Sequence, residues 1–158
     1  MLKQTLAPEL LGANYQKFNI SANGGQRVAC YNLPTPVKYA LTGFLRAPIL
    51  FVTPNKIEAD RALENLSAYF QKVEYLPAKP DNLVFASVFS SDVLYERLAA
   101  IKAIAFDNPD VIVATAESLM GLFPNVDIYK SRAFTLNVGD EISLSALSEK
   151  LVLCGYER

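Results

Sequence analysis

Residues 47–70, "APILFVTPNKIEADRALENLSAYF", decide the fold. The first part, 47–54, is a continuous apolar run bounded by prolines, which is typical of a strand buried on both faces of a sheet. In the second part apolar residues recur at helical spacing and charged residues fall between them. Asn55 is a suitable N-cap for this helix. The predicted apolar stripe consists of Ile57, Ala59, Ala62, Leu63, Leu66 and Phe70.

The same alternation continues along the chain. A shorter strand is predicted at 72–77, a helix at 93–106 and a third buried strand at 109–118, followed by a short helix that ends at Pro124. Strands that alternate with helices indicate an α/β fold, with a parallel sheet, right-handed crossovers and flanking helices. The helix at 93–106 is expected to be capped by Ser91 or Asp92 and to bury Leu94, Leu98, Ile101 and Ala105.

The segment between the second strand and this helix, "AKPDNLVFASVFSSD", is rich in loop residues. A loop of this length is either functional or a connector over the sheet edge, and both readings stay open.

Composition excludes several kinds of function. Of 158 residues, 51% are hydrophobic, enough for a core, and 15 basic against 16 acidic residues leave no field that would attract nucleic acid. Histidine is absent, so the commonest general base and metal ligand is missing, and neither a metal nor a serine nucleophile at Ser90-Ser91-Asp92 is expected.

The two cysteines, Cys30 and Cys154, are predicted to be buried thiols in a reducing compartment. Without a signal peptide or membrane-length apolar run, we expect a soluble cytoplasmic protein.

The tail has a different pattern. Residues 132–138 are predicted to form a strand and Gly139-Asp140 a turn. A helix from about Ser143 is expected to bury Leu144, Leu147 and Leu151, with Val152 as a further candidate. One strand and one helix cannot cover each other's apolar faces. We therefore expect 131–158 to be the beginning of a second domain, with enough exposed apolar surface for some self-association.

The stretch "ISANGGQR" at 20–27 is the candidate ligand site. It follows the run "YQKFNI", interpreted as the first strand, and precedes "RVACYNL", interpreted as a helix start. A phosphate loop occupies that position and has the pattern G-x-x-x-x-G-K-[ST], but the lysine is absent here. The stretch is either a phosphate loop that has lost its chemistry or an ordinary glycine turn.

Four segments in order carry a family resemblance: "PILFVTPNKIEADRALENL", "LYERLAAIKAI", "PDVIVATAESLMGLFP" and "LNVGDEISLSALSEKLVLCGYER". From about Phe18 to Arg158 the chain resembles the amino-terminal region of the bacterial transcription-repair coupling factors, Mfd, which is similar to the repair helicase subunit UvrB. The resemblance implies a degenerate P-loop helicase-like lobe. It divides the chain into a UvrB-like domain 1a at 1–130 and a truncated domain 2 at 131–158.

The resemblance also aligns the residues of the candidate loop with the phosphate loop of the family. Ser21, Ala22, Asn23, Gly24, Gly25 and Gln26 fall on the family's phosphate loop and Arg27 follows. Gly25 or Gln26 stands where lysine is required, and no hydroxyl follows for Mg²⁺. Arg27 has a different reach and shape from lysine. No nucleotide cofactor is therefore expected.

The implied function is that of a non-catalytic module in transcription-coupled nucleotide excision repair. In the full-length family, this region recruits UvrA and contacts the rest of its own chain in an autoinhibited state, while RNA polymerase and DNA bind other domains. UvrA binding by this chain is expected to be weak or absent, because most of domain 2 is missing. The alternative is a helicase-like lobe that still binds ATP.

Overall fold

The computed structural model describes residues 12–79, 91–120, 123, 125–154 and 156. The chain forms two compact units, residues 1–121 and 122–158, which are taken one at a time below. The division between a UvrB-like domain 1a and domain 2 at 130 and 131 stays a prediction.

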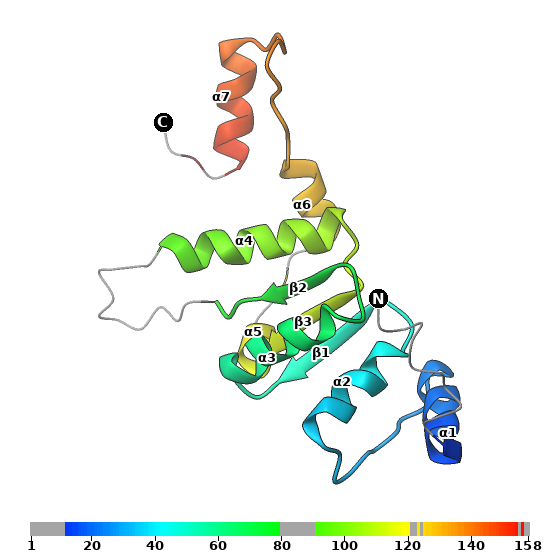
Figure 1. The fold of residues 1–158 in the computed structure, drawn as a ribbon. Coiled ribbons are helices and arrows are strands. Elements are labelled where there is room, and N and C mark those ends of the chain that lie inside the picture. Colours follow the sequence, from blue (N-terminus) through cyan, green and yellow to red (C-terminus); the bar gives the residue numbers. More distant parts are fainter. Residues whose placement is uncertain (1–11, 80–90, 121–122, 124, 155, 157–158) are drawn as a thin grey trace. The chain divides into compact units, whose positions relative to one another are not determined.

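The first unit is built on a three-stranded parallel sheet in the order β1-β3-β2 (Figure 1). The strands are β1 (Ile49–Thr53), β2 (Val73–Leu76) and β3 (Val111–Thr115). Val111 lies opposite both Ile49 and Val73, which fixes the register of the whole sheet. The predicted α/β fold with a parallel sheet is confirmed, and each strand lies within its expected range.

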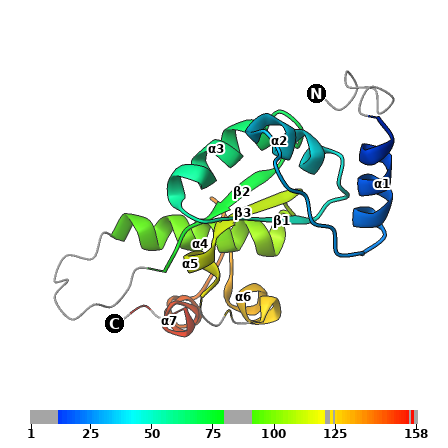
Figure 2. The ribbon, with the colours of Figure 1, turned by 90° about the horizontal axis from the view of Figure 1, so that it is seen from below.

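Helices cover both faces of the sheet (Figure 2). The chain passes from β1 to β2 through α3 (Lys56–Leu66) and returns to β3 through α4 (Ser91–Phe106). These two crossovers run in opposite directions across the sheet, so the same right-handedness places their helices on opposite faces. A further helix, α2 (Thr35–Gly43), packs beside α3.

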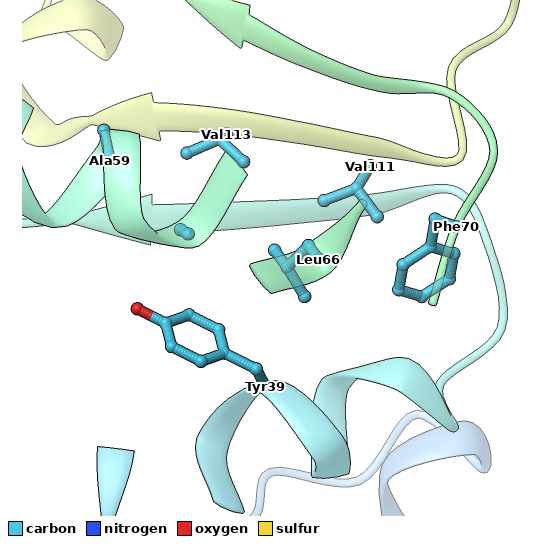
Figure 3. Close-up of a cluster of buried hydrophobic side chains, with 7 residues drawn as sticks. Tyr39, Ala59, Leu66, Phe70, Val111 and Val113 are labelled. Carbon is cyan, nitrogen blue, oxygen red and sulfur yellow. The ribbon is translucent and has the colours of Figure 1, made fainter. Parts of the chain in front are cut away.

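The α3 face of the sheet holds the larger core (Figure 3). Its buried residues are Tyr39, Ala59, Ala62, Leu66, Phe70, Val111 and Val113. The ring of Tyr39 packs against Phe51, with 6.0 Å between centroids. The predicted stripe of α3 is confirmed except at Ile57, which is 65% exposed because it lies in the first turn, away from the core.

The α4 face holds a smaller core made of Leu76, Ala100 and Ala114, with Ile101, Ile104 and Ile112 packed around them. The predicted stripe of α4 is only partly correct. Leu94 and Leu98 are about half exposed, whereas Arg97 occupies a buried position. α4 begins at Ser91 and has Asp92 in its first turn, and the cap by one of these two residues stays a prediction.

The prediction that β1 is buried on both faces is wrong. Leu50 and Val52 point to the α4 face and remain 53% and 51% exposed. The reason is the strand order, because β1 is at the edge of the sheet and α4 packs over β2 and β3.

The chain before the sheet also differs from expectation. Residues 15–20 are not a strand but part of α1 (Gly12–Asn23), which packs Tyr15 edge-on against Phe44 at 5.1 Å. The predicted helix start at 27–33 is wrong as well, because 26–34 contain no helix or strand and α2 begins at Thr35.

After β3, the first unit ends with α5 (Ala116–Leu119), which is shorter than predicted. The second unit contains α6 (Val126–Arg132), which was not predicted, and α7 (Leu144–Leu153). The expected strand at 132–138 is wrong, since these residues finish α6 and continue without regular structure.

The predicted cap of the last helix is confirmed, because the hydroxyl of Ser143 accepts the amide of Ala146 at 3.2 Å. The predicted turn is present at Gly139, whose φ is 101°. Leu147 and Leu151 are half-buried, but Leu144 is 84% exposed and Val152 47%, so burial of these two is wrong.

Both cysteines are free and exposed, so the expectation that they are buried is wrong. The thiol of Cys154 donates to the carbonyl oxygen of Arg132 at 3.0 Å. None of the helices in the described ranges combines the length and the apolar character that a membrane crossing needs.

Candidate functional site

The candidate phosphate loop lies at the end of a helix, not after a strand. Ser21, Ala22 and Asn23 form the last turn of α1, Gly24 and Gly25 form the turn that follows, and Gln26 and Arg27 continue into the loop before α2. The expectation that this stretch follows the first strand is therefore wrong. A phosphate loop needs a helix to begin after it, and here a helix ends.

The backbone amides of this turn are bonded to the helix that precedes them. Gln26 donates to the carbonyl oxygen of Ser21 at 3.0 Å, and Gly25 donates to that of Ala22 at 3.2 Å. This pair of bonds is the Schellman motif, which requires a residue with positive φ at the second position after the last helical residue. Gly25 is that residue, with φ +78°. The second glycine of "NGG" is therefore explained by helix termination.

The electrostatics of the turn disfavour a phosphate. The carboxyl end of a helix carries a partial negative charge, the opposite of the amino end at which phosphates bind. Asn23 ties the turn to the chain before β1, because its Oδ1 accepts the amide of Arg46 at 2.9 Å. Arg27 is the nearest cation in sequence and is exposed.

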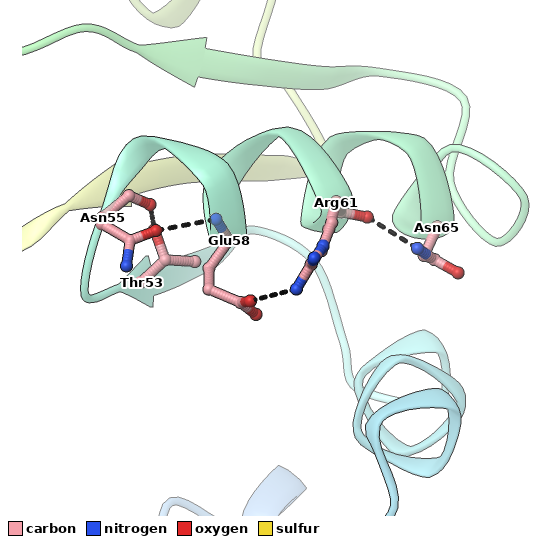
Figure 4. Close-up of polar contacts among 5 residues, drawn as sticks. All are labelled: Thr53, Asn55, Glu58, Arg61 and Asn65. Atoms are coloured by element: carbon pink, nitrogen blue, oxygen red, sulfur yellow. Dashed lines mark hydrogen bonds and ion pairs between the residues drawn. The ribbon is translucent and has the colours of Figure 1, made fainter.

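The carboxyl edge of the parallel sheet is the other place where ligands bind in such folds. Here α3 begins directly after β1 (Figure 4), and its first turn is capped from within the chain. Asn55 Oδ1 accepts the amide of Glu58 at 2.9 Å, while the hydroxyl of Thr53 donates to the carbonyl oxygen of Asn55 at 3.2 Å. The carboxylate of Glu58 accepts from Arg61 at 2.6 Å and adds negative charge at this helix start.

The short helix α5 begins directly after β3 and is also self-capped. Thr115 and Ser118 form a capping box: the Thr115 hydroxyl accepts the amide of Ser118 at 3.1 Å, and the Ser118 hydroxyl accepts the amide of Thr115 at 3.3 Å. Both side chains are buried. Their polar atoms are satisfied by each other and are not directed at a ligand.

The start of α2 lies toward the arrowhead end of β1 (Figure 1) and offers few amides. Pro34 is its N-cap residue and Pro36 lies in the first turn, so neither supplies an N–H. The amides of Val37 and Lys38 both donate to the carbonyl oxygen of Pro34, at 3.0 and 3.3 Å. Thr35 alone contributes another amide to that turn.

Comparison with known proteins gives the ancestry of the chain. No family model matches it. It is 26% identical over 121 residues to the transcription-repair-coupling factor of Bacillus subtilis, an alignment that covers 75% of this chain and 10% of that protein. It is 33% identical over 90 residues to UvrABC system protein B of Methanococcus maripaludis, with 57% and 14% covered, and 31% identical over 127 residues to that of Fervidobacterium nodosum, with 70% and 19% covered.

The chain is a homologue of the transcription-repair-coupling factors and of UvrB. It spans between a tenth and a fifth of the length of these relatives. The resemblance to a UvrB-like region of the coupling factors is confirmed.

Sequence reasoning missed a buried cation in this UvrB-like unit. Arg97 of α4 is 9% exposed, and its guanidinium donates to the carbonyl oxygens of Pro77, just after β2, and Ser118 of α5 at 3.5 Å. The signal in the sequence was its position, three residues after Leu94 and four before Ile101 on the face of α4 that was expected to be apolar. Arg97 thus joins three elements near the carboxyl edge of the sheet.

Aromatic side chains can stack on nucleic-acid bases, and Ser90 belongs to the serine stretch considered above, but these residues are scattered along the chain. Phe70 belongs to the core, Phe123 is 42% exposed, and Phe85, Phe89 and Ser90 lie outside the described residues. Within the described ranges, no three His, Cys, Asp or Glu side chains are grouped in a way that could hold a metal ion. The polar side chains of Asn55, Thr115 and Ser118 at the sheet edge are bonded within the fold.

Proposed function

We propose that this chain acts in nucleotide excision repair, in the cytoplasm, as a non-catalytic helicase-like module that works through protein contacts. The homology to coupling factors and UvrB supports the repair role. In the intact family, the resemblance assigns to this region UvrA recruitment and an autoinhibitory contact with the rest of the chain, and it assigns RNA polymerase and DNA to other domains.

The observation that carries the absence of ATP hydrolysis is the Schellman motif at Ser21–Gln26. A nucleotide lobe uses free loop amides and a lysine to hold phosphates. Here the amides of Gly25 and Gln26 are bonded to α1, and Arg27 replaces neither the lysine nor the hydroxyl that holds Mg²⁺. The self-capped starts of α3 and α5 support the same conclusion.

Calorimetric titration with ATP and Mg²⁺ tests this proposal against the nucleotide-binding alternative. We expect no saturable heat from the unaltered chain. Saturable heat that is lost in Arg27→Ala would establish the alternative and overturn the proposal. Arg46→Ala is the matched control, since it removes a cation close to the same turn but outside the candidate loop.

A second experiment addresses the partner. UvrA binding is measured for this chain and for a fusion with the region that follows in the Bacillus subtilis relative. We expect the fusion to bind and this chain to bind weakly or not at all, because the resemblance places most of the UvrA contact in domain 2. If neither protein binds UvrA, the proposed partner is wrong, although the repair ancestry remains.

A further inference from the structure

The outer edge of β1 is one of the two outer edges of the described sheet. Within the part of the chain that the structure describes, β1 forms a ladder with β3 alone. The amide of Ile49 donates toward β3, to the carbonyl oxygen of Asp110 at 2.9 Å. Because backbone groups alternate in direction along a strand, those of Phe51 and Thr53 also face β3, whereas those of Leu50 and Val52 face outward.

The same two residues also expose their side chains. Leu50 and Val52 are 53% and 51% exposed on the face that α4 leaves uncovered beside β1. An open hollow of about 430 Å³ adjoins this face and is lined partly by Pro48, Ile104 and Ile112. Exposed edges of this kind are sites of strand addition, and an apolar face beside one is a site of association.

We propose that β1 is a self-association edge, on which β1 of a second copy of this chain pairs antiparallel across a two-fold axis at Phe51. In this arrangement Leu50 of each copy lies opposite Val52 of the other. Residues opposite each other with outward-facing groups exchange two hydrogen bonds, so the two equivalent pairs form four. The four side chains of these pairs lie together on one face and bury each other.

The sequence of β1 favours a second copy as the occupant. A two-fold interface must be complementary to itself. Residues 49–53 carry no charge, so copies meet without like-charge repulsion. An uncharged edge offers nothing to attract a strongly charged partner.

The flanking prolines select the register. Pro48 and Pro54 bound the strand and have no N–H to donate. Pairing Leu50 with Val52 keeps all four hydrogen bonds within strand residues. A shift by two in either direction makes two of the bonds depend on the carbonyl of Pro48 or Pro54, outside the strand. The ladder is therefore short, and the dimer is expected to be weak and to depend on concentration.

Sedimentation equilibrium over a wide concentration range tests the proposal. We expect a reversible dimer whose dissociation constant rises about tenfold or more in Val52→Lys, because an edge lysine opposes strand pairing. Ile57→Lys is the matched control: it replaces an equally accessible β-branched residue, 65% exposed on α3, and is expected to leave the dissociation constant unchanged. Circular dichroism shows whether each variant is folded.

A cross-linking experiment tests the register without a change of charge. In a Cys30→Ser, Cys154→Ser background, Leu50→Cys and Val52→Cys chains are oxidised separately and as a mixture. We expect the mixture to cross-link at least several-fold more than either variant alone, because only the mixture places two thiols directly opposite. A chain that stays monomeric at every concentration, a dimer unaffected by Val52→Lys, or equal cross-linking in all three samples would each overturn the proposal.

Discussion

The amide of Gln26 donates to the carbonyl oxygen of Ser21 over 3.0 Å, and this bond is the outer of the two that end α1 in a Schellman motif. The stretch "NGG" therefore marks the carboxyl end of a helix. A glycine-rich stretch predicts either a phosphate loop or a turn, and the two differ in where the amides point. In this chain they point back into the preceding helix.

Gly25→Ala is expected to destabilise the first unit by about 1–2 kcal/mol, because an L side chain at φ +78° is strained. The measurement is urea unfolding followed by circular dichroism. A Cβ at this position meets no atom within 4 Å, so the cost comes from backbone conformation and not from crowding.

Gly25→Asn is the control for this interpretation. Asn also adds a Cβ, but it adopts the left-handed region more readily than Ala does. The loss of unfolding free energy should therefore be smaller for Asn than for Ala. Equal losses would show that the positive φ is not what the glycine supplies.

The sequence predicted the positions of the three strands well, although β1 is exposed on one face. The runs at 47–54, 72–77 and 109–118 became β1, β2 and β3, and Asn55 and Ser143 cap the helices that they were predicted to cap. These features depend on local patterns: continuous apolar residues, helical periodicity and a polar residue at the helix start.

The wrong predictions share one cause, because each depends on contacts between elements that are distant in the sequence. The apolar spacing of "YQKFNI" fits either a strand or a helix, and the structure has α1. Burial of Leu50 and Leu98 was predicted from apolarity, yet strand order leaves β1 at the edge, and α4 turns Arg97 inward. Neither strand order nor the carbonyl partners of an arginine can be read from periodicity.

Arg97→Leu is expected to lower the free energy of unfolding by about 2–4 kcal/mol. The substitution leaves the carbonyl oxygens of Pro77 and Ser118 without a charged donor in a buried site. Chemical unfolding gives the magnitude. Arg61→Ala, which removes an exposed partner of Glu58, should cost no more than about 1 kcal/mol, and a comparable loss in both variants would contradict the role assigned to Arg97.

Gly43→Ala is expected to cost about 1–3 kcal/mol, because the last residue of α2 lies against the ring of Tyr69. A Cβ on Gly43 would be 2.5 Å from Cδ1 and 2.7 Å from Cγ of Tyr69, closer than real contacts allow. Thermal unfolding measures the loss. In the Tyr69→Ala background the same substitution should cost clearly less, and simple additivity of the two changes would argue against this contact.

Stability at alkaline pH is expected to depend on Tyr39. Burial, reinforced by Glu58 and opposed by Arg61, raises the pKa of Tyr39 above 10.0. Above about pH 10 the unfolded chain therefore loses this proton first, so the unfolding free energy falls as pH rises toward the folded pKa, by at most about 1.4 kcal/mol per pH unit.

Tyr39→Phe should reduce that slope relative to the unaltered chain in urea titrations between pH 9 and about 11. Tyr31→Phe, which removes an 83% exposed phenol, is the control, and an equal change in both variants would mean that burial of Tyr39 does not set the slope.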